Sequence, residues 1–336
     1  MTSLPHGSSS PVSVCRPSPQ SRGAIMSDPV VEVDPSWAIV GALLLAVLVM
    51  IAVALDGMLA ARAQGGSAAA SLRWPAAETA RLLRQRRRST VAADSLLWRI
   101  GGAGMLVAAL LKITVVPFGE WTLFDFEAGL VWFNAMDALV WALVWLVGWG
   151  GNSVHALVGG YRFLALAVAY ELPLMFALIA TAIASESLNV GDIVAAQSEL
   201  WFIVWMPVAF LIYSIGVVAF SVWGPFGSSL GADIAGGVAA ELSGVDRLVF
   251  FAGRYGVLVA GAAFAVPLFL GGGSGAVLPA WAWSLLKTVV VLAAFVWVRR
   301  KVPLMRPEKF MEVGWMLLIP AGMLQDLLIA LVMVNR

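Results

Sequence analysis

An acidic residue stands in the middle of a long apolar segment of this chain, within the step Tyr170-Glu171-Leu172-Pro173. A charged side chain at bilayer depth costs roughly 2.5–3.5 kcal/mol on insertion scales, so it usually faces a partner or a water-filled path inside the protein. Pro173 has no N–H for the carbonyl of Ala169, which leaves that acceptor free beside the acid. The pattern favours proton transfer at Glu171. The alternative is a structural acid that a Tyr, Ser or Arg of a neighbouring helix satisfies.

A second acid, Asp137, lies at a similar depth in the preceding apolar segment. Two carboxylates that lie close together do not both ionise easily, so a pair at one depth can share and pass protons. We therefore predict that Glu171 and Asp137 form two steps of a proton relay. The alternative is that Asp137 faces another cavity or pairs with Arg254 or Lys287.

Three basic side chains lie close to the ends of their apolar segments, where a long side chain can reach water. These are Lys112, Arg254 and Lys287, and the sequence predicts that each extends to the membrane surface. Asp326 lies deeper, directly after Gln325, and the simplest expectation is a buried hydrogen bond between the two.

Composition places the chain in the membrane. Of its 336 residues 61% are hydrophobic and 12% are charged, with a mean hydropathy of +0.90, whereas soluble domains carry about twice that charge. One cysteine, Cys15, and two histidines, His6 and His155, offer neither a disulfide framework nor a Cys- or His-based metal site. Any redox centre must then belong to another subunit or to a bound small molecule. We expect membrane lipids, and no nucleic acid, among the partners.

Eight apolar stretches each approach the ~20 residues that a membrane-spanning helix requires. They are continuous rather than alternating, which excludes a transmembrane barrel. The prediction is an all-α integral membrane protein, a bundle of about eight transmembrane helices within a membrane domain at 37–336. A Ser- and Pro-rich tail at 1–36, in which Met26 is a second candidate start, is predicted to be disordered. The predicted spans are 37–55, 96–116, 129–149, 162–183, 201–220, 248–270, 281–298 and 315–334.

Basic residues alternate between the loops and predict the orientation. The loop at 56–95 carries seven arginines and the loop at 299–314 carries five basic residues. Because basic loops face the cytoplasm, we expect a multi-pass protein of the bacterial inner membrane with both termini outside. Within the first basic loop, Trp74 to Arg88 favours an amphipathic helix on the membrane surface or an ordinary basic anchor. The loops without Lys or Arg are 117–128, 184–200 and 271–280.

Several local strings, collinear from about Asp56 to Val334, follow the order and spacing of one family. The chain resembles the H subunit of respiratory complex I, the NADH-quinone oxidoreductase. The longest matching stretch is Gly148 to Gln197, which includes the Tyr-Glu-Leu-Pro step. Shorter matches are Val116-Pro117-Phe118-Gly119, Leu286-Lys287-Thr288, Trp297-Val298-Arg299, Pro303, Arg306 and Gly314-Trp315.

The resemblance implies a membrane subunit that meets the peripheral arm and helps to form the quinone chamber. Quinone would be the substrate, no cofactor would be covalently bound, and iron–sulfur centres and flavin would lie only in partner subunits. The partners would be peripheral-arm quinone-module subunits and small membrane subunits. Glu171 and Asp137 would act in catalysis. Arg162 would lie at the edge of the quinone chamber, and the alternative is that it only anchors its helix at the membrane boundary. The further candidates for the quinone chamber or the proton path are Arg162, Tyr170, Asp233, Glu241, Arg254 and Arg299.

Three departures from the family concern charge. The strongly acidic loop expected after span five is Phe220 to Gly231, which contains no acid; the Glu-Tyr of span six is Arg254-Tyr255; and the Glu-Arg-Arg that ends span one is Asp56-Gly57-Met58. We therefore expect a diverged paralogue. Two alternatives stay open: a structural subunit that has lost quinone coupling, and the related membrane subunit of a membrane-bound hydrogenase.

Overall fold

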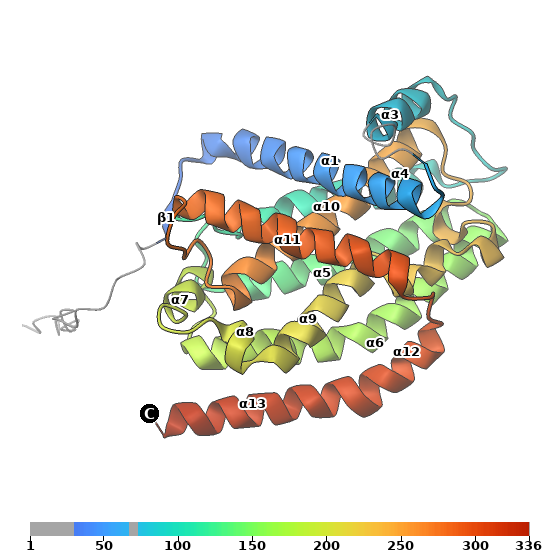
Figure 1. Ribbon diagram of the computed structural model, residues 1–336. Coiled ribbons are helices and arrows are strands. Elements are labelled where there is room, and N and C mark those ends of the chain that lie inside the picture. The colour runs from blue at the N-terminus through green and yellow to red at the C-terminus, as the bar shows by residue number, and fades with distance from the viewer. Residues whose placement is uncertain (1–29, 67–72, 336) are drawn as a thin grey trace, which may run out of the picture.

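The protein is a bundle of long helices, as the sequence predicts (Figure 1). The computed structural model describes residues 30–66 and 73–335. Among these residues, eight helices are long and apolar enough to cross a membrane, which confirms the all-α membrane fold. These spans are formed by α1 (Ala38–Ala63), α4 (Ser95–Ile113), α5 (Gly129–Gly150), α6 (Val154–Ser185), α9 (Pro207–Phe220) with the 3-10 helix η2 (Gly224–Leu230) that follows it, α10 (Gly244–Phe269), α11 (Ala280–Lys301) and the run α12 (Pro307–Val313), η5 (Gly314–Leu318) and α13 (Ile319–Val334).

The bounds of four spans differ from the prediction by six residues or more. α1 ends at Ala63, eight residues after the predicted end, and the last run begins at Pro307, eight residues before the predicted start. α6 begins at Val154, eight residues before the predicted start at Arg162, because Gly159 and Gly160 are accommodated in the helix rather than ending it. Arg162 therefore lies about two turns inside α6. α9 begins later than predicted because Pro207 occupies its first turn, where a missing N–H costs no hydrogen bond. The short α8 (Phe202–Trp205) precedes it.

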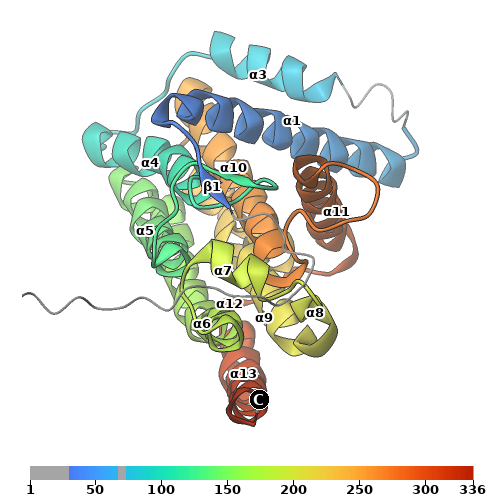
Figure 2. The ribbon, with the colours of Figure 1, turned by 90° about the vertical axis from the view of Figure 1, so that its left-hand side faces the viewer.

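α10 forms the core of the bundle, with other helices packed around it (Figure 2). Every residue from Gly253 to Phe269 is buried. Glycines on this helix let the neighbouring helices approach closely. A Cβ on Gly253 would lie 2.5 Å from the backbone nitrogen of Leu106 in α4, and one on Gly261 would lie 2.5 Å from Val217 in α9. Small residues on α10 thus fix the distances to α4 and α9.

The end of the N-terminal tail is ordered. The expected disorder of residues 1–36 concerns mainly residues 1–29, which lie outside the described residues. Directly after them, β1 (Val31–Glu32) pairs in parallel with β2 (Trp121–Thr122). A turn of 3-10 helix, η1 (Pro35–Trp37), then leads into α1, and Asp34 caps it by accepting from the backbone N–H of Ser36 at 2.9 Å. Pairing with β2 explains why this short polar segment is ordered.

The helix expected in the first basic loop is present as α3 (Trp74–Arg84), with proline in its first turn. One side buries Pro75 and Leu82 against the protein, and Arg81 is on the exposed side. α3 packs against α10 and α1 at the end of the bundle that carries the basic loops, which we call the inner end (Figure 1). Its place on the membrane surface stays a prediction.

The approach of α5 to α6 at Gly148 yields a stability prediction. A Cβ on this glycine would lie 2.7 Å from the carbonyl oxygen of Ala156, so Gly148→Ala forces the two backbones apart. Overpacking of this kind costs about 1–3 kcal/mol, and we expect a lower midpoint of thermal unfolding in detergent. Gly102→Ala is the matched control, because nothing lies within 4 Å of its added Cβ. Equal stability of the two variants would contradict the close approach.

Candidate functional site

Asn134 on α5 contacts Glu171 on α6 and lies one turn from Asp137, the other acid predicted to act with it. Glu171 lies near the middle of α6, and its Oε1 accepts a hydrogen bond of 3.1 Å from Nδ2 of Asn134 on α5. Asp137 lies one turn further along α5, and residues three apart in a helix are neighbours on its surface. Asp137 is fully buried. The carboxylate of Glu171 therefore faces the inside of the bundle rather than lipid.

A buried cation balances Asp137. Nζ of Lys112, on α4, lies 3.4 Å from Oδ1 of Asp137, and the two side chains are 0% and 1% exposed. The ammonium also lies over two aromatic rings, 4.3 Å from the centroid of Phe133 and 3.7 Å from that of Phe220. Ring faces attract a cation, most strongly where water is excluded. The carboxylate of Asp137 and the two rings therefore stabilise the ammonium charge of Lys112 at a place that is shielded from water.

Tyr170 lies beside the same charges. Its hydroxyl accepts a hydrogen bond of 2.9 Å from Nε1 of Trp141 on α5. Its ring packs against Phe220 with the centroids 6.4 Å apart, so Phe220 contacts both Tyr170 and Lys112. Because an indole N–H only donates, the tyrosine keeps its own hydroxyl proton free for another acceptor.

Unsatisfied polar atoms gather at this place. Native proteins leave few buried polar atoms without a partner, and each costs about 1–3 kcal/mol when nothing satisfies it. Five such atoms occur here, each without a hydrogen-bond partner among the described residues. They are Nζ of Lys112, Oδ1 of Asn134, Oδ1 and Oδ2 of Asp137, and Oε2 of Glu171. We call Lys112, Asn134, Asp137, Tyr170 and Glu171 the intramembrane group; it has the donors, acceptors and titratable charges that proton transfer requires.

One expectation about this group is wrong, and so is one of the alternatives given for Asp137. Lys112 does not reach water, because it turns to Asp137 on the next helix and packs between rings. Asp137 pairs with Lys112 and not with Arg254 or Lys287. Lys287 instead donates three hydrogen bonds of 2.7–2.9 Å to backbone carbonyls of the segment at 270–274. The feature of the sequence that could have predicted this pair is that span two carries a single Lys and span three a single Asp.

A second charged group surrounds Asp56 at the inner end of α1, and we call it the inner group. Its Oδ2 lies 2.6 Å from Nη1 of Arg299 and its Oδ1 lies 2.7 Å from Nη2 of Arg300, both at the end of α11. The hydroxyl of Tyr255, on α10, donates to Oδ2 at 3.2 Å. Sequence reasoning registered Asp56 only as a departure from the family. In the structure it is the acid that ties α1, α10 and α11 together.

Arg254 belongs to this inner group and is buried, so its expected reach to water is wrong. It donates to the carbonyls of Ser221 at 3.2 Å and Val222 at 2.6 Å. These carbonyls follow the end of α9, where helix acceptors lack intrahelical partners. The ring of Trp223 lies close to two cations, with Cζ of Arg254 at 4.8 Å and Cζ of Arg299 at 4.6 Å from its centroid. Backbone dipoles and one indole therefore stabilise two neighbouring guanidinium groups.

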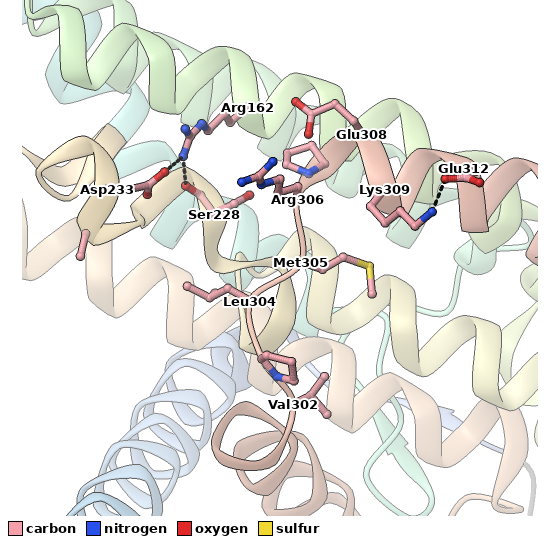
Figure 3. Close-up of a pocket in the computed structure, with 13 residues that line it drawn as sticks. Arg162, Ser228, Asp233, Val302, Leu304, Met305, Arg306, Glu308, Lys309 and Glu312 are labelled. Carbon is pink, nitrogen blue, oxygen red and sulfur yellow. Dashed lines mark hydrogen bonds and ion pairs between the residues drawn. The ribbon is translucent and has the colours of Figure 1, made fainter.

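An open groove of about 1100 Å³ lies at the inner end, between α6, the segment at 228–233 and the segment at 302–312 (Figure 3). Arg162 donates from Nη1 to Asp233 at 2.7 Å and to the carbonyl of Ser228 at 3.4 Å. Gly159, one turn before Arg162, permits this arrangement, because a Cβ there would lie 2.4 Å from the backbone of Val238. The hydrogen bond from Arg162 lowers the pKa of Asp233 below its ordinary value.

The predicted site residues thus fall into separate places. Glu171, Asp137 and Tyr170 share the intramembrane group, Arg254 and Arg299 share the inner group, and Arg162 pairs with Asp233 in the groove. Glu241 stands apart and accepts a hydrogen bond of 2.9 Å from Ser153. Within residues 30–66 and 73–335, no three His, Cys, Asp or Glu side chains lie close enough together to hold a metal ion.

Comparison with known proteins gives the family. A family model described as NADH dehydrogenase matches residues 36–330. The chain belongs to the family of NADH-quinone oxidoreductase H subunits. H subunit 2 of Geobacter sulfurreducens is 34% identical over 265 residues, which cover 76% of this chain and 80% of the relative. H subunit 1 of Geobacter metallireducens is 33% identical over 273 residues, 78% of this chain and 83% of the relative. H subunit 2 of Rhodopseudomonas palustris is 32% identical over 268 residues, with 79% and 84% covered. The resemblance seen in the sequence is confirmed.

Two of the departures from the family meet in the inner group. Arg254 stands where the resemblance to the H subunit leads us to expect a glutamate. Its guanidinium binds the carbonyls of Ser221 and Val222, so the reversed charge needs no acid of its own. The loop that carries these carbonyls is also the one that lacks the expected acids. The two departures are therefore joined by direct contact.

The ion pair inside the membrane can be tested by a double-mutant cycle. Lys112→Met leaves the carboxylate of Asp137 buried without its counter-charge, and breaking a buried pair from one side costs about 3–5 kcal/mol. We expect a large fall in the thermal midpoint for Lys112→Met, and recovery of much of it in Lys112→Met combined with Asp137→Leu. A double variant no more stable than the single one would contradict the pair.

The groove pair predicts a pH dependence. Because the folded-state pKa of Asp233 is lowered, the pair stabilises the protein above the ordinary Asp pKa of about 4, and this contribution is lost as the pH falls through the lowered value. Asp233→Asn should therefore lower the thermal midpoint equally at about pH 6 and pH 8, and the difference from wild type should shrink below about pH 4 and vanish only below the lowered pKa of Asp233. Arg162→Gln should show the same profile. An effect that changes between pH 6 and pH 8 would show that Asp233 titrates there instead.

Proposed function

We propose that this chain is a membrane-arm subunit of a proton-translocating NADH-quinone oxidoreductase. In this proposal it carries no redox centre and works only within the complex, where peripheral-arm quinone-module subunits and small membrane subunits are its neighbours. Iron–sulfur centres and flavin lie in those partners, and quinone is the substrate. Membership of the H-subunit family supports this assignment.

The observation that carries the proposal is the intramembrane group. Glu171 and Asp137 would take up and pass protons, with Asn134 hydrogen-bonded to Glu171 and the cation of Lys112 beside Asp137. When Asp137 receives a proton, its attraction for the ammonium is lost and the energy of that charge changes. Each proton movement thereby alters the affinity of the next site for a proton. This is the electrostatic coupling that a relay between quinone chemistry and the membrane arm needs.

The inner end would form part of the quinone chamber. The groove beside Arg162 and Asp233 opens there, and the inner group with Arg254 and Arg299 lies at the same end of the bundle. A quinone that accepts two electrons takes up two protons, so positive charge close to its oxygens favours the reduced, anionic form before protonation. Arg162 in the groove and Arg254 and Arg299 in the inner group could supply this positive charge.

For orientation we propose that the inner end faces the cytoplasm of a bacterial inner membrane. The first described residues and the C-terminal end of α13 lie at the opposite end of the bundle (Figure 1), and the loops at that end carry no Lys or Arg. The basic residues of the loop after α1 and of the last turn of α11 gather at the inner end. This distribution is typical of a chain with both termini outside.

A second candidate function is a structural subunit without quinone coupling. The observation in its favour is the inner group, where uncharged residues and Arg254 replace the acids that the resemblance to the H subunit leads us to expect. Net positive charge there would oppose the passage of protons from the chamber to Asp137. A wild-type complex that reduces quinone but moves no protons would favour this candidate.

The proposal is tested by Glu171→Gln in the intact complex, reconstituted in vesicles. The amide keeps the shape and the contact to Asn134 but cannot exchange a proton, so we expect quinone-driven proton movement to fall about 100-fold or more. NADH oxidation and internal acidification are measured together. Glu199→Gln, an exposed acid outside the spans, is the matched control and should act as wild type. Unchanged proton movement in Glu171→Gln would reject the role of this acid.

A further inference from the structure

α13 is the most exposed span of the bundle, together with α1. It lies at the edge of the molecule, and its contacts are mainly with α6 and α9 (Figure 2). Gly322 brings it close to α6, since a Cβ there would lie 3.0 Å from Phe176. Its outward face is apolar. The large hydrophobic side chains exposed on α13 include Met323, Leu324, Leu327, Leu328 and Leu331.

One carboxylate interrupts this apolar face. Asp326 is half-buried, and its Oδ1 is shielded from solvent with no hydrogen-bond partner among the described residues. The expected hydrogen bond to Gln325 does not form: Gln325 is buried, whereas Asp326, the next residue along the helix, is only half-buried. Asp326 lies eight residues before the end of α13, about 12 Å at 1.5 Å per residue. Its short side chain cannot reach water over that distance.

From this acid and the face around it we infer that α13 is the docking surface for a transmembrane helix of another subunit, which places a Lys or Arg side chain against Asp326. Acids in membrane spans rarely face lipid, and they pair with one another, with cations or with backbone groups. The described helices of this chain leave Asp326 without such a partner, so we assign the partner to another subunit.

Two other occupants fit the face less well. A second copy of this chain, docked through the same surface, would bring a second carboxylate to Asp326, and like charges repel. Lipid alone would leave the acid in hydrocarbon. α1 shows the contrast: its outward face is just as apolar, with Ile39 and Leu43 exposed, but its one acid, Asp56, is satisfied at the inner end. Lipid suffices for α1 and does not suffice for α13.

The adjacent surface of α6 extends the docking face. Leu172, Met175 and Ile179 are exposed on α6 within four residues of Phe176, which lies next to Gly322 of α13, so an incoming helix would lie in the angle between the two. Close helix packing of this kind gives the geometry in which a polar pair can form away from lipid. The inference rests on the proposed function only in requiring a membrane complex, and it holds for either candidate function.

The test uses the native complex and photo-crosslinking. A benzophenone amino acid replaces Met323, which lies one turn before Asp326 and is 54% exposed; the same replacement at Leu43, on the outward face of α1, is the control. We expect Met323 to crosslink to another membrane subunit that carries a Lys or Arg within a span, and Leu43 to crosslink mainly to lipid. Crosslinks from Met323 only to lipid, or to a second copy of this chain, would overturn the inference.

A charge series completes the test. Asp326→Glu keeps the carboxylate and should retain the crosslinked subunit during purification. Asp326→Leu and Asp326→Lys should reduce its recovery at least tenfold, and Asp326→Asn should lie between. Full retention in Asp326→Lys would overturn the proposed ion pair. If no membrane subunit copurifies with the wild-type chain, the proposed function fails; if subunits copurify but none crosslinks at Met323, only this inference fails.

Discussion

The ion pair of Lys112 and Asp137 is the interaction on which the centre of this bundle depends. Neither charge could stay at this depth alone, because the desolvation of each has no compensation other than the opposite charge and the rings of Phe133 and Phe220. The pair also determines how α4 and α5 face each other. Once their facing is fixed, Asn134 is directed to α6 and meets Glu171. A charge requirement thus sets the rotation of three helices.

At the inner end the buried charges are balanced in a different way. There the cations outnumber the acids, and Asp56 is shared by two arginines while Arg254 binds backbone carbonyls. The ring of Trp223 contacts both Arg254 and Arg299. Close to the membrane surface such an excess of positive charge is tolerable, because Arg299 and Arg300 keep about a third of each side chain exposed. The centre of the bundle has no such exposure, and the charges of Lys112 and Asp137 are balanced one to one.

The sequence predicts much of the scaffold and little of the pairing. Apolar length and loop charge are local properties, so all eight spans, α3 and the central position of Glu171 could be read directly. Which side of a helix meets which neighbour depends on packing across the whole bundle. Lys112 lies near the end of α4 by count, yet it turns inward, and Asp56 and Arg299 are separated by most of the chain. Interactions between distant segments such as these were the ones that sequence reasoning missed.

The first span is attached to the rest of the protein at two points, and between them only Leu45, Leu48 and Ala52 of α1 are buried. At one end the two-residue pairing of β1 with β2 attaches the chain to the segment between α4 and α5. At the other end Asp56 attaches α1 to α10 and α11. A rod clamped at both ends cannot swing away from its neighbours as a rigid body. We expect α1 to move mainly by bending in the middle. Such bending would widen and narrow the contact between α1 and its neighbours α10 and α11 while both ends stay in place.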